Sequence, residues 1–349
     1  MFSGRATRTL LAAVATAAVV ATTMAVASST DGGPSATIAP RRLGPDTDPQ
    51  VLAISLDGLN PDALRRLGRR GAPHLWRLFD EGAGTLNARS EYEQTVTLPN
   101  HTGMVTGRRI DRGHGGHGVT WNDDRLRPRT VQRAAHHGVS SVFARVDRGG
   151  GSAAVFSTKQ KFSLFQRSWP TGVDRSVISF DDDAGVTAAA RADLVARDRA
   201  FTLLHLGAAD KAGHAAGWMS SSYLAAVRRL DGLVGDVLAD AERDPALADL
   251  TIIVTADHGG VPGSRDHGQR RRPANYTVPF VVWGPGIERA DLYAINPGYR
   301  DPGRSRPGLT GQQPVRNGDV ANLALGLLGL RPVPGSLFGV RRPLRVVAG

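Results

Sequence analysis

Residues 51–58 have the sequence VLAISLDG, a short apolar run that ends at an acid and a glycine. Such a run, without alternating polar positions, is typical of a parallel strand buried on both faces. Comparable runs recur at 152–157, 201–206, 250–255 and 278–283. The sequence therefore predicts a set of buried strands, several of which are followed directly by polar side chains.

Helical patterns lie between these runs. The longest spans 222–241, and shorter ones are predicted at 62–69, 73–81 and 100–106, with a last helix that Asp319 would cap and that runs through Leu330. The segment 140–146 fits either a strand or a helix, and Ser140 as a cap favours the helix. Strands that alternate with helices predict an α/β fold with a mostly parallel central sheet and helices on both faces. Residues 108–200 hold fewer apolar runs, and we expect them to contribute a small cap over the site.

The first 27 residues have the pattern of a secretory signal peptide. Arg5 and Arg8 precede an apolar run at 10–27, which closes with small residues suited to cleavage after Ala27. Retention of this run as a membrane anchor is the alternative. Residues 28–48 are rich in Ser, Gly, Pro and Thr and predict a flexible leader, so that the catalytic domain spans 49–349. We therefore expect an exported protein without a transmembrane segment in its mature chain.

The composition excludes several kinds of catalytic and metal-binding site. The 349 residues include no cysteine, which excludes disulfides, thiolate metal sites and cysteine nucleophiles. The formal net charge of +11 could draw anionic substrates inward. No basic stripe interleaved with aromatic residues is present, so we expect no specific binding of nucleic acid. The oligomeric state is not predicted.

Acidic and histidine side chains follow three of the predicted strands. In open parallel sheets, ligands bind beyond the carboxyl ends of the strands. Each residue alone has a plainer interpretation, such as a turn, a helix cap or a surface histidine. Three carboxylates and three imidazoles divide into two metal sites that suit zinc, with manganese or iron left open. The candidate ligands are Asp57, Asp210, His214, Asp257, His258 and His267.

The candidate nucleophile lies in the segment Thr97-Leu98-Pro99-Asn100-His101. A threonine hydroxyl becomes a competent nucleophile when metal coordination lowers its pKa. A helix that starts at Pro99 would place Thr97 near free backbone N–H groups, which favour phosphate. The alternative is that Thr97 only caps this helix.

This segment resembles the T-x-P-N-H signature of the nucleotide pyrophosphatase/phosphodiesterase family of the alkaline phosphatase superfamily. The same family order continues with Asp210-x-x-Gly213-His214, Asp257-His258-Gly259 and a late His-Gly. The pair His117-Gly118 and the run from Val278 to Gly286 also resemble family landmarks. The resemblance covers roughly residues 51–340 and implies an alkaline phosphatase-like fold.

The resemblance also implies roles for the residues that match. Asp57, Asp257 and His258, with the Thr97 oxygen, would hold the metal that activates the nucleophile. Asp210, His214 and His267 would hold a second metal, which activates water. Thr97 would attack phosphorus and form a covalent intermediate, and Asn100 would donate a hydrogen bond to a phosphoryl oxygen. The implied activity is that of a two-metal phosphodiesterase or pyrophosphatase, acting on a small phosphate ester or nucleotide.

The sequence departs from the family between His258 and His267, where vertebrate-type members carry a long insertion. Nucleotide-binding loops are not recognisable, so nucleotide preference is not implied. Arg271 and Lys161 are candidates for substrate contacts through a phosphate or carboxylate, and a solvated charge run is the alternative.

Other functions remain open on the same scaffold. A phosphomonoesterase or a phosphonate hydrolase is the nearest enzyme alternative, and an inactive exported binding protein is a more distant one. A sulfatase is disfavoured because no Cys or Ser is followed by x-Pro-x-Arg.

Overall fold

The computed structural model describes residues 49–125 and 129–347. The chain divides into units at 1–39 and 40–349, and all the described residues belong to the second. The predicted signal peptide and leader lie outside the described residues.

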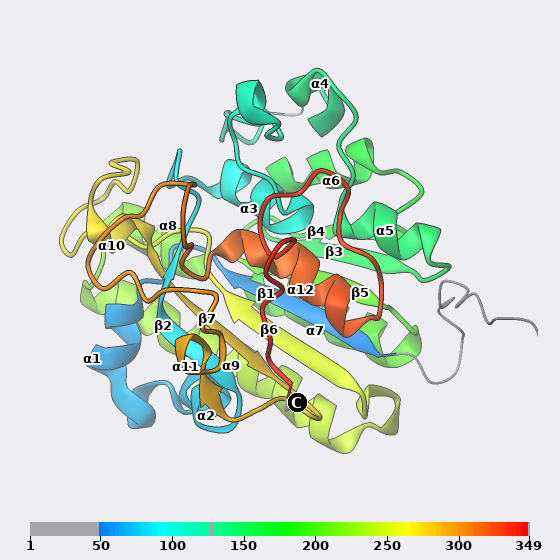
Figure 1. Cartoon of the computed structure of the whole chain (residues 1–349). Helices are drawn as coiled ribbons and strands as arrows, with labels where there is room; N and C mark the ends of the chain where they lie inside the picture. Colours follow the sequence, from blue (N-terminus) through cyan, green and yellow to red (C-terminus); the bar gives the residue numbers. More distant parts are fainter. Residues whose placement is uncertain (1–48, 126–128, 348–349) are drawn as a thin grey trace, which may run out of the picture. The chain divides into compact units, whose positions relative to one another are not determined.

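A single sheet of eight strands organises this unit (Figure 1), in the order β4-β3-β5-β1-β6-β7-β2-β8. The first five of these strands run parallel, whereas β7 is antiparallel to both of its neighbours. The mostly parallel sheet that the sequence predicts is therefore confirmed. The strands are β1 (Gln50–Leu56), β2 (Ala83–Arg89), β3 (Ala153–Ser157), β4 (Arg175–Ile178), β5 (Phe201–Leu206), β6 (Leu250–Thr255), β7 (Thr277–Trp283) and β8 (Ala290–Asp291).

The three central strands of the sheet end at one edge, and the polar residues that follow them lie there. β1 lies between β5 and β6, and all seven of its residues are buried. Ser55 is level with His205 of β5 and Thr255 of β6, so the three strands end at the same edge. The residues that follow these strands in sequence consequently meet in space.

Helices cover both faces of the sheet (Figure 1). One face is covered by α1 (Pro61–Gly71), α2 (Pro73–Glu81), α7 (Asp183–Ala196) and α9 (Ser221–Arg243), which pack on the strands or on one another. The other face carries α3 (Thr97–Thr106), α5 (Val142–Arg148) and α12 (Val320–Leu327), which contact one another. Shorter helices are α4 (Val131–Ala135), α6 (Ser163–Ser168), α8 (Ala208–Ala216), α10 (Pro273–Tyr276) and α11 (Leu292–Ile295).

Several boundaries differ from those predicted. α5 is capped by Ser141, whose hydroxyl accepts the Ala144 N–H, rather than by Ser140. α12 ends at Leu327, before Leu330. Asp319 stands at the first cap of α12, but its carboxylate accepts the Arg316 N–H and the Tyr299 hydroxyl instead of capping the helix.

The range 108–200 contributes to the main sheet as well as to its surroundings. β3 and β4 form one side of the sheet, and α5 and α7 contact it from opposite faces. These elements are therefore not a separate cap, although the loop at 119–124 does approach the site described below. No helix in the described ranges combines the length and the apolar character needed to cross a bilayer.

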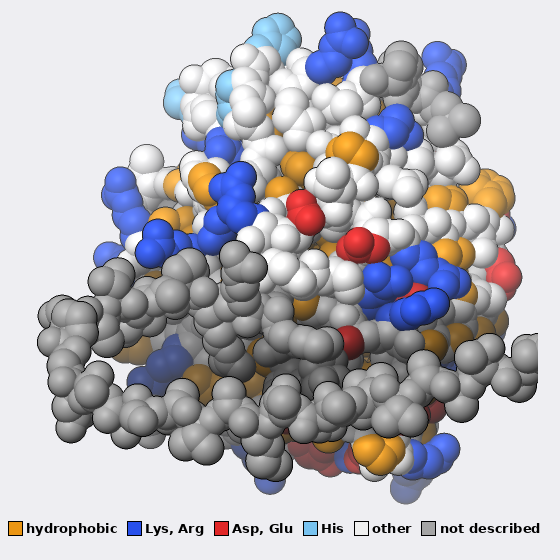
Figure 2. Space-filling view, turned by 90° about the vertical axis from the view of Figure 1, so that its right-hand side faces the viewer, with side chains coloured by type: hydrophobic (Ala, Val, Ile, Leu, Met, Phe, Trp, Pro, Cys, Tyr) orange, Lys and Arg blue, Asp and Glu red, His pale blue; other side chains and the backbone are white. Residues whose placement is uncertain are grey.

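The surface of the unit agrees with the sequence's net charge of +11. Lys and Arg side chains, drawn in blue, are prominent on the described part of the face in Figure 2, beside a few acidic ones.

Candidate active site

The site lies at the edge of the sheet where β1, β5 and β6 end. Asp57 directly follows β1, and Asp257 and His258 follow β6. α8 begins soon after β5 and carries Asp210 and His214 one turn apart. The Asp210 N–H donates to the Asp57 carbonyl, which joins the first two strand ends.

Glycine is required where these two segments meet. Gly58 has a φ of +72°, and a Cβ at this position would lie 3.0 Å from the Asp210 Cα. Its N–H donates to the Asp257 carboxylate, so this turn also holds the β6 residue in place.

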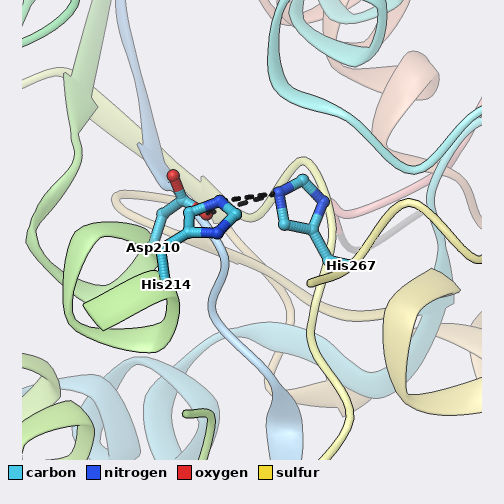
Figure 3. A group of neighbouring side chains, drawn as sticks. All are labelled: Asp210, His214 and His267. Carbon is cyan, nitrogen blue, oxygen red and sulfur yellow. Dashed lines mark hydrogen bonds and ion pairs between the residues drawn. The ribbon is translucent and has the colours of Figure 1, made fainter. Parts of the chain in front are cut away.

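His267 reaches the site from the loop after β6 (Figure 3). Its Nδ1 donates to the Thr95 carbonyl at 2.6 Å, and the Thr95 hydroxyl donates to the His267 carbonyl at the same distance. The ring stacks on His258, with centroids 3.6 Å apart. Its Nε2 therefore lies 3.1 Å from the His214 Nε2 and 3.6 Å from Asp210 Oδ1.

The three histidines share one orientation. Nδ1 of each lies at hydrogen-bond distance from a backbone carbonyl: His214 to Arg265, His258 to Gly259 and His267 to Thr95. A proton on each Nδ1 leaves the Nε2 lone pairs directed into the site. This is the arrangement that metal-binding imidazoles adopt.

Four atoms in this cluster are buried and have no hydrogen-bond partner among the described residues: Asp57 Oδ1, Asp210 Oδ1, Asp257 Oδ2 and His258 Nε2. Such atoms are costly to bury unless a ligand satisfies them. Two groups have ligand atoms that lie within 4.8 Å of one another. The first group is Asp57, Asp210 and His258, and the second is Asp210, His214 and His267. The residues therefore fit divalent cations.

The predicted metal ligands thus come together, with one difference in grouping. Asp210 belongs to both groups, whereas the sequence assigned it to the second metal alone. Asp257 lies beside the first group, with Oδ2 3.2 Å from the His258 Nε2.

A buried lysine supplies the positive charge next to these carboxylates. Nζ of Lys159, which follows β3, lies 2.6 Å from Oδ2 of both Asp57 and Asp210. Burial acts to raise the pKa of Asp57, but Lys159 and the hydrogen bond from His205 outweigh it and hold this pKa well below its ordinary value.

Burial shifts the pKa values of Asp257, His258 and His267 as well. Burial, together with the charge of Asp57, raises the pKa of Asp257 well above its ordinary value. Burial lowers the pKa of His258 to about 3 and also lowers that of His267, so both imidazoles are neutral near pH 7. Neutral imidazole is the form that binds metals.

Thr97 is the first residue of α3 and is buried. The cap of the helix is Val96, so the alternative in which Thr97 serves only as a cap does not hold. Its carbonyl lies 2.8 Å from the His101 Nδ1, and the same nitrogen is 3.7 Å from Asp257 Oδ2. The Thr97 hydroxyl has no hydrogen-bond partner among the described residues. The next N–H groups of the helix are engaged, because the Leu98 N–H donates to Asn122 and the Asn100 N–H donates to the Val96 carbonyl, while Pro99 has none.

Asn100 is used differently from the way the sequence predicts. Its amide nitrogen donates to the carbonyls of Gln94 and Val96, and its oxygen accepts from Glu91 N and Asn317 Nδ2. Both amide hydrogens are engaged, so this side chain fastens the loop before α3 and offers no free donor to a phosphoryl oxygen.

Asn122 is a candidate for phosphoryl binding that the sequence did not predict. Its oxygen accepts the Leu98 N–H at the start of α3, and its amide nitrogen has no partner among the described residues. The sequence feature that could have pointed to Asn122 is the pair His117-Gly118, which resembles a family landmark and precedes Asn122 by a few residues.

The two predicted substrate residues lie in different settings. The buried ammonium of Lys161 contacts the Asn122 carbonyl and lies 3.5 Å from Asp124, next to the start of α3. Arg271 is exposed on the loop that follows His267. Its role in substrate binding stays a prediction.

Comparison with known proteins bears on the family and on the fold. The sequence model described as "Type I phosphodiesterase / nucleotide pyrophosphatase" matches residues 51–305. Among solved structures, an inactive variant of murine ectonucleotide pyrophosphatase / phosphodiesterase 5 in complex with AMP is similar, with a TM-score of 0.61 and 14% identity over 82% of this chain and 96% of that chain. A 2-O GAG sulfatase has a TM-score of 0.55 and 13% identity over 81% of this chain and 71% of that chain. At these identities, the likeness concerns the fold alone.

Curated relatives match over shorter stretches. GPI ethanolamine phosphate transferase 1 of Neurospora crassa is 30% identical over 148 residues, which cover 40% of this chain and 14% of that protein. The same transferase of Chaetomium globosum is 33% identical over 112 residues, covering 32% of this chain and 12% of that protein. The chain thus spans a small part of these relatives. The family match, in contrast, covers most of the chain, and the chain belongs to the type I phosphodiesterase / nucleotide pyrophosphatase family.

Proposed function

We propose that this chain is an exported, two-metal hydrolase of phosphate esters, of the phosphodiesterase or nucleotide pyrophosphatase type, with Thr97 as its nucleophile. The observation that carries the proposal is the set of four buried, unpartnered carboxylate and imidazole atoms at the ends of β1, β5 and β6. Membership of the family supports the same reaction class.

The donor set suits divalent cations, with Zn²⁺ expected. Asp57, Asp257 and His258 would hold one of them together with the Thr97 oxygen, and His214 and His267 the other, with Asp210 within reach of both. When bound, these cations would lower the pKa of the attacking hydroxyl and water and offset the charge that develops on oxygen.

The chain's own residues then position the phosphoryl group. Thr97 Oγ loses its proton and forms a bond to phosphorus, while the bond from phosphorus to the leaving oxygen breaks and that oxygen takes up a proton. Water then attacks phosphorus, the bond to Oγ breaks, and the Thr97 hydroxyl is restored. The amide nitrogen of Asn122 and the ammonium of Lys161 would stabilise the phosphoryl oxygens.

The substrate is expected to be a small phosphate ester or a nucleotide. A likeness in fold to a structure that contains AMP supports a pocket of this kind. A phosphomonoesterase or phosphonate hydrolase would use the same residues, and an inactive binding protein would keep the fold without turnover. The signal pattern at 1–27 supports the proposal of export.

A direct experiment compares wild type with Thr97→Ala and Thr97→Ser on an aryl phosphodiester, an aryl phosphate monoester and a dinucleotide. We expect Thr97→Ala to lose activity by about 10³-fold or more while its unfolding curve is unchanged, because the nucleophile is removed. Thr97→Ser should retain measurable turnover, since it keeps a hydroxyl.

Removal of metal tests the other half of the proposal. Chelation followed by zinc addition should abolish and restore activity, and elemental analysis should find bound metal. Turnover by Thr97→Ala near the wild-type rate, or an active protein without metal, would reject the mechanism. The ratio of kcat/KM between the diester and the monoester distinguishes the two enzyme alternatives.

A further inference from the structure

We infer that Lys159 is an internal counter-cation of the metal centre, which stabilises the site before metal is bound and makes metal binding weaker than it would otherwise be. The inference rests on the proposed function in one respect, namely that divalent metal binds at this site. It concerns a residue to which the family motifs assign no role.

The position of the lysine is well defined. Lys159 comes shortly after β3 ends, and its side chain is 14% exposed. Nζ lies 2.6 Å from Asp57 Oδ2 and 2.6 Å from Asp210 Oδ2, although these two acids come from different strand ends. One ammonium therefore joins a carboxylate of the first metal group to the carboxylate that both groups share.

The contacts divide each carboxylate into two parts. The Oδ2 atoms of Asp57 and Asp210 face Lys159, and the Oδ1 atoms are the buried ones without a partner. The Oδ1 atom of Asp210 points toward the Nε2 atoms of His214 and His267, at 3.4 and 3.6 Å. Lysine and metal can consequently contact the same carboxylates from opposite sides.

In the part of the chain that the structure describes, no second lysine or arginine takes the place of Lys159. Among the described residues, the other ionisable partners of Asp57, Asp210 and Asp257 within 4.0 Å are all histidines: His101, His205, His214, His258 and His267. Without metal, the ammonium is thus the permanent positive charge in contact with Asp57 and Asp210. A buried carboxylate that loses its only strong cationic partner destabilises the fold.

The same charge acts against an incoming divalent cation. Lys159 contacts two carboxylates that the metal also needs, so the two like charges are held within a few ångströms of each other in a poorly screened environment. The lysine therefore lowers the affinity for metal while it keeps the ligands assembled. Replacing it by an apolar residue should lower the stability of the metal-free protein and raise its affinity for metal.

The test uses the full-length protein with Lys159→Met, which removes the charge and keeps an unbranched side chain. Lys159→Arg keeps the charge. Lys211→Met is the matched control, because Lys211 is adjacent to Asp210 in sequence but is exposed and pairs with Asp181. For each protein, the melting temperature is measured after chelation and with saturating zinc, and the zinc Kd is measured by competition with a chromogenic chelator.

We expect the metal-free Lys159→Met protein to melt about 6–10 °C below wild type, with a much smaller difference in zinc. Its zinc Kd should be at least about tenfold lower than that of wild type. Lys159→Arg and Lys211→Met should stay close to wild type in both measurements. If Lys159→Met folds only in zinc, recovery of folded protein on refolding with zinc supports the inference, and failure to recover overturns it.

An unchanged melting temperature without metal, or weaker zinc binding by Lys159→Met, would also overturn the inference, because the lysine would then only orient the carboxylates or do nothing. A wild-type protein that binds no zinc would instead reject the metal site of the proposed function. The two failures are thus distinguishable.

Discussion

Gly213 lies inside α8, between Asp210 and His214, at a position where helix propensity alone would favour alanine by about 1 kcal/mol. A Cβ at Gly213, however, would lie 2.6–2.8 Å from three atoms of the Trp218 ring. Trp218 is fully buried, and its indole N–H donates to the Gly58 carbonyl, so the ring has little room to move.

Overpacking of this kind costs about 1–3 kcal/mol. Gly213→Ala should therefore lose about 0–2 kcal/mol of unfolding free energy once the gain in helix propensity is subtracted. The chain offers a matched control in Gly232, which lies inside α9, where an added Cβ meets no atom within 4 Å. Gly232→Ala should gain about 1 kcal/mol.

The difference between the two variants then measures the steric cost alone. Urea unfolding of wild type and both variants, followed by circular dichroism in the presence of a chelator, gives the three free energies. Equal free energies for the two alanine variants, within about 0.5 kcal/mol, would refute the close packing of Trp218 on α8. Zinc binding by Gly213→Ala should also weaken, since the displaced turn carries two ligands.

Two further changes test other parts of the structure. Asn122→Ala should lower kcat/KM by about 10²-fold, because it removes a donor to the phosphoryl group. It should also cost about 1 kcal/mol of unfolding free energy, because the Leu98 N–H loses its acceptor. Unchanged activity in an aryl phosphodiester assay would contradict the catalytic role. Glu91 is buried with neither carboxylate oxygen partnered among the described residues, and burial together with Glu93 raises its pKa well above the ordinary value. The folded protein then holds a proton that the unfolded chain releases, so wild-type stability should fall as pH rises above about 4.5 toward the raised pKa. Glu91→Gln should show a smaller fall, because Asp257, whose pKa is also raised, still contributes. Urea unfolding at several pH values checks the difference, and identical pH slopes would contradict it.

The sequence predicts the centre of the fold well because that centre is made of local patterns. The run at 51–56 is apolar throughout, and the structure buries every residue of β1. Strands of this kind are recognisable one at a time, and the acids that follow them meet because parallel strands end at a common edge.

The rest depends on contacts that no local pattern encodes. β4 is four residues long with an exposed or half-buried surface, and β2 contains Gly84 and Asn87, so neither has the apolar run of a buried strand. Each becomes a strand only because a neighbour in the sheet pairs with it.

The same limit explains the errors within the site. Asn100 and Asn122 are both polar residues near Thr97, and only the fold shows that the amide hydrogens of Asn100 are already engaged. Lys159 follows β3 as an unremarkable lysine in sequence, while its partners are 102 and 51 residues away.

The reciprocal hydrogen bonds between Thr95 and His267 join segments that are 172 residues apart. A growing or truncated chain that stops short of residue 267 can contain Asp57, Thr97 and Asp210 and still lack the last imidazole. Binding of the two proposed ions would therefore require the chain through His267. Contacts that close so long a loop form more slowly than a single helix, so we expect the proposed metal site to be completed late in folding.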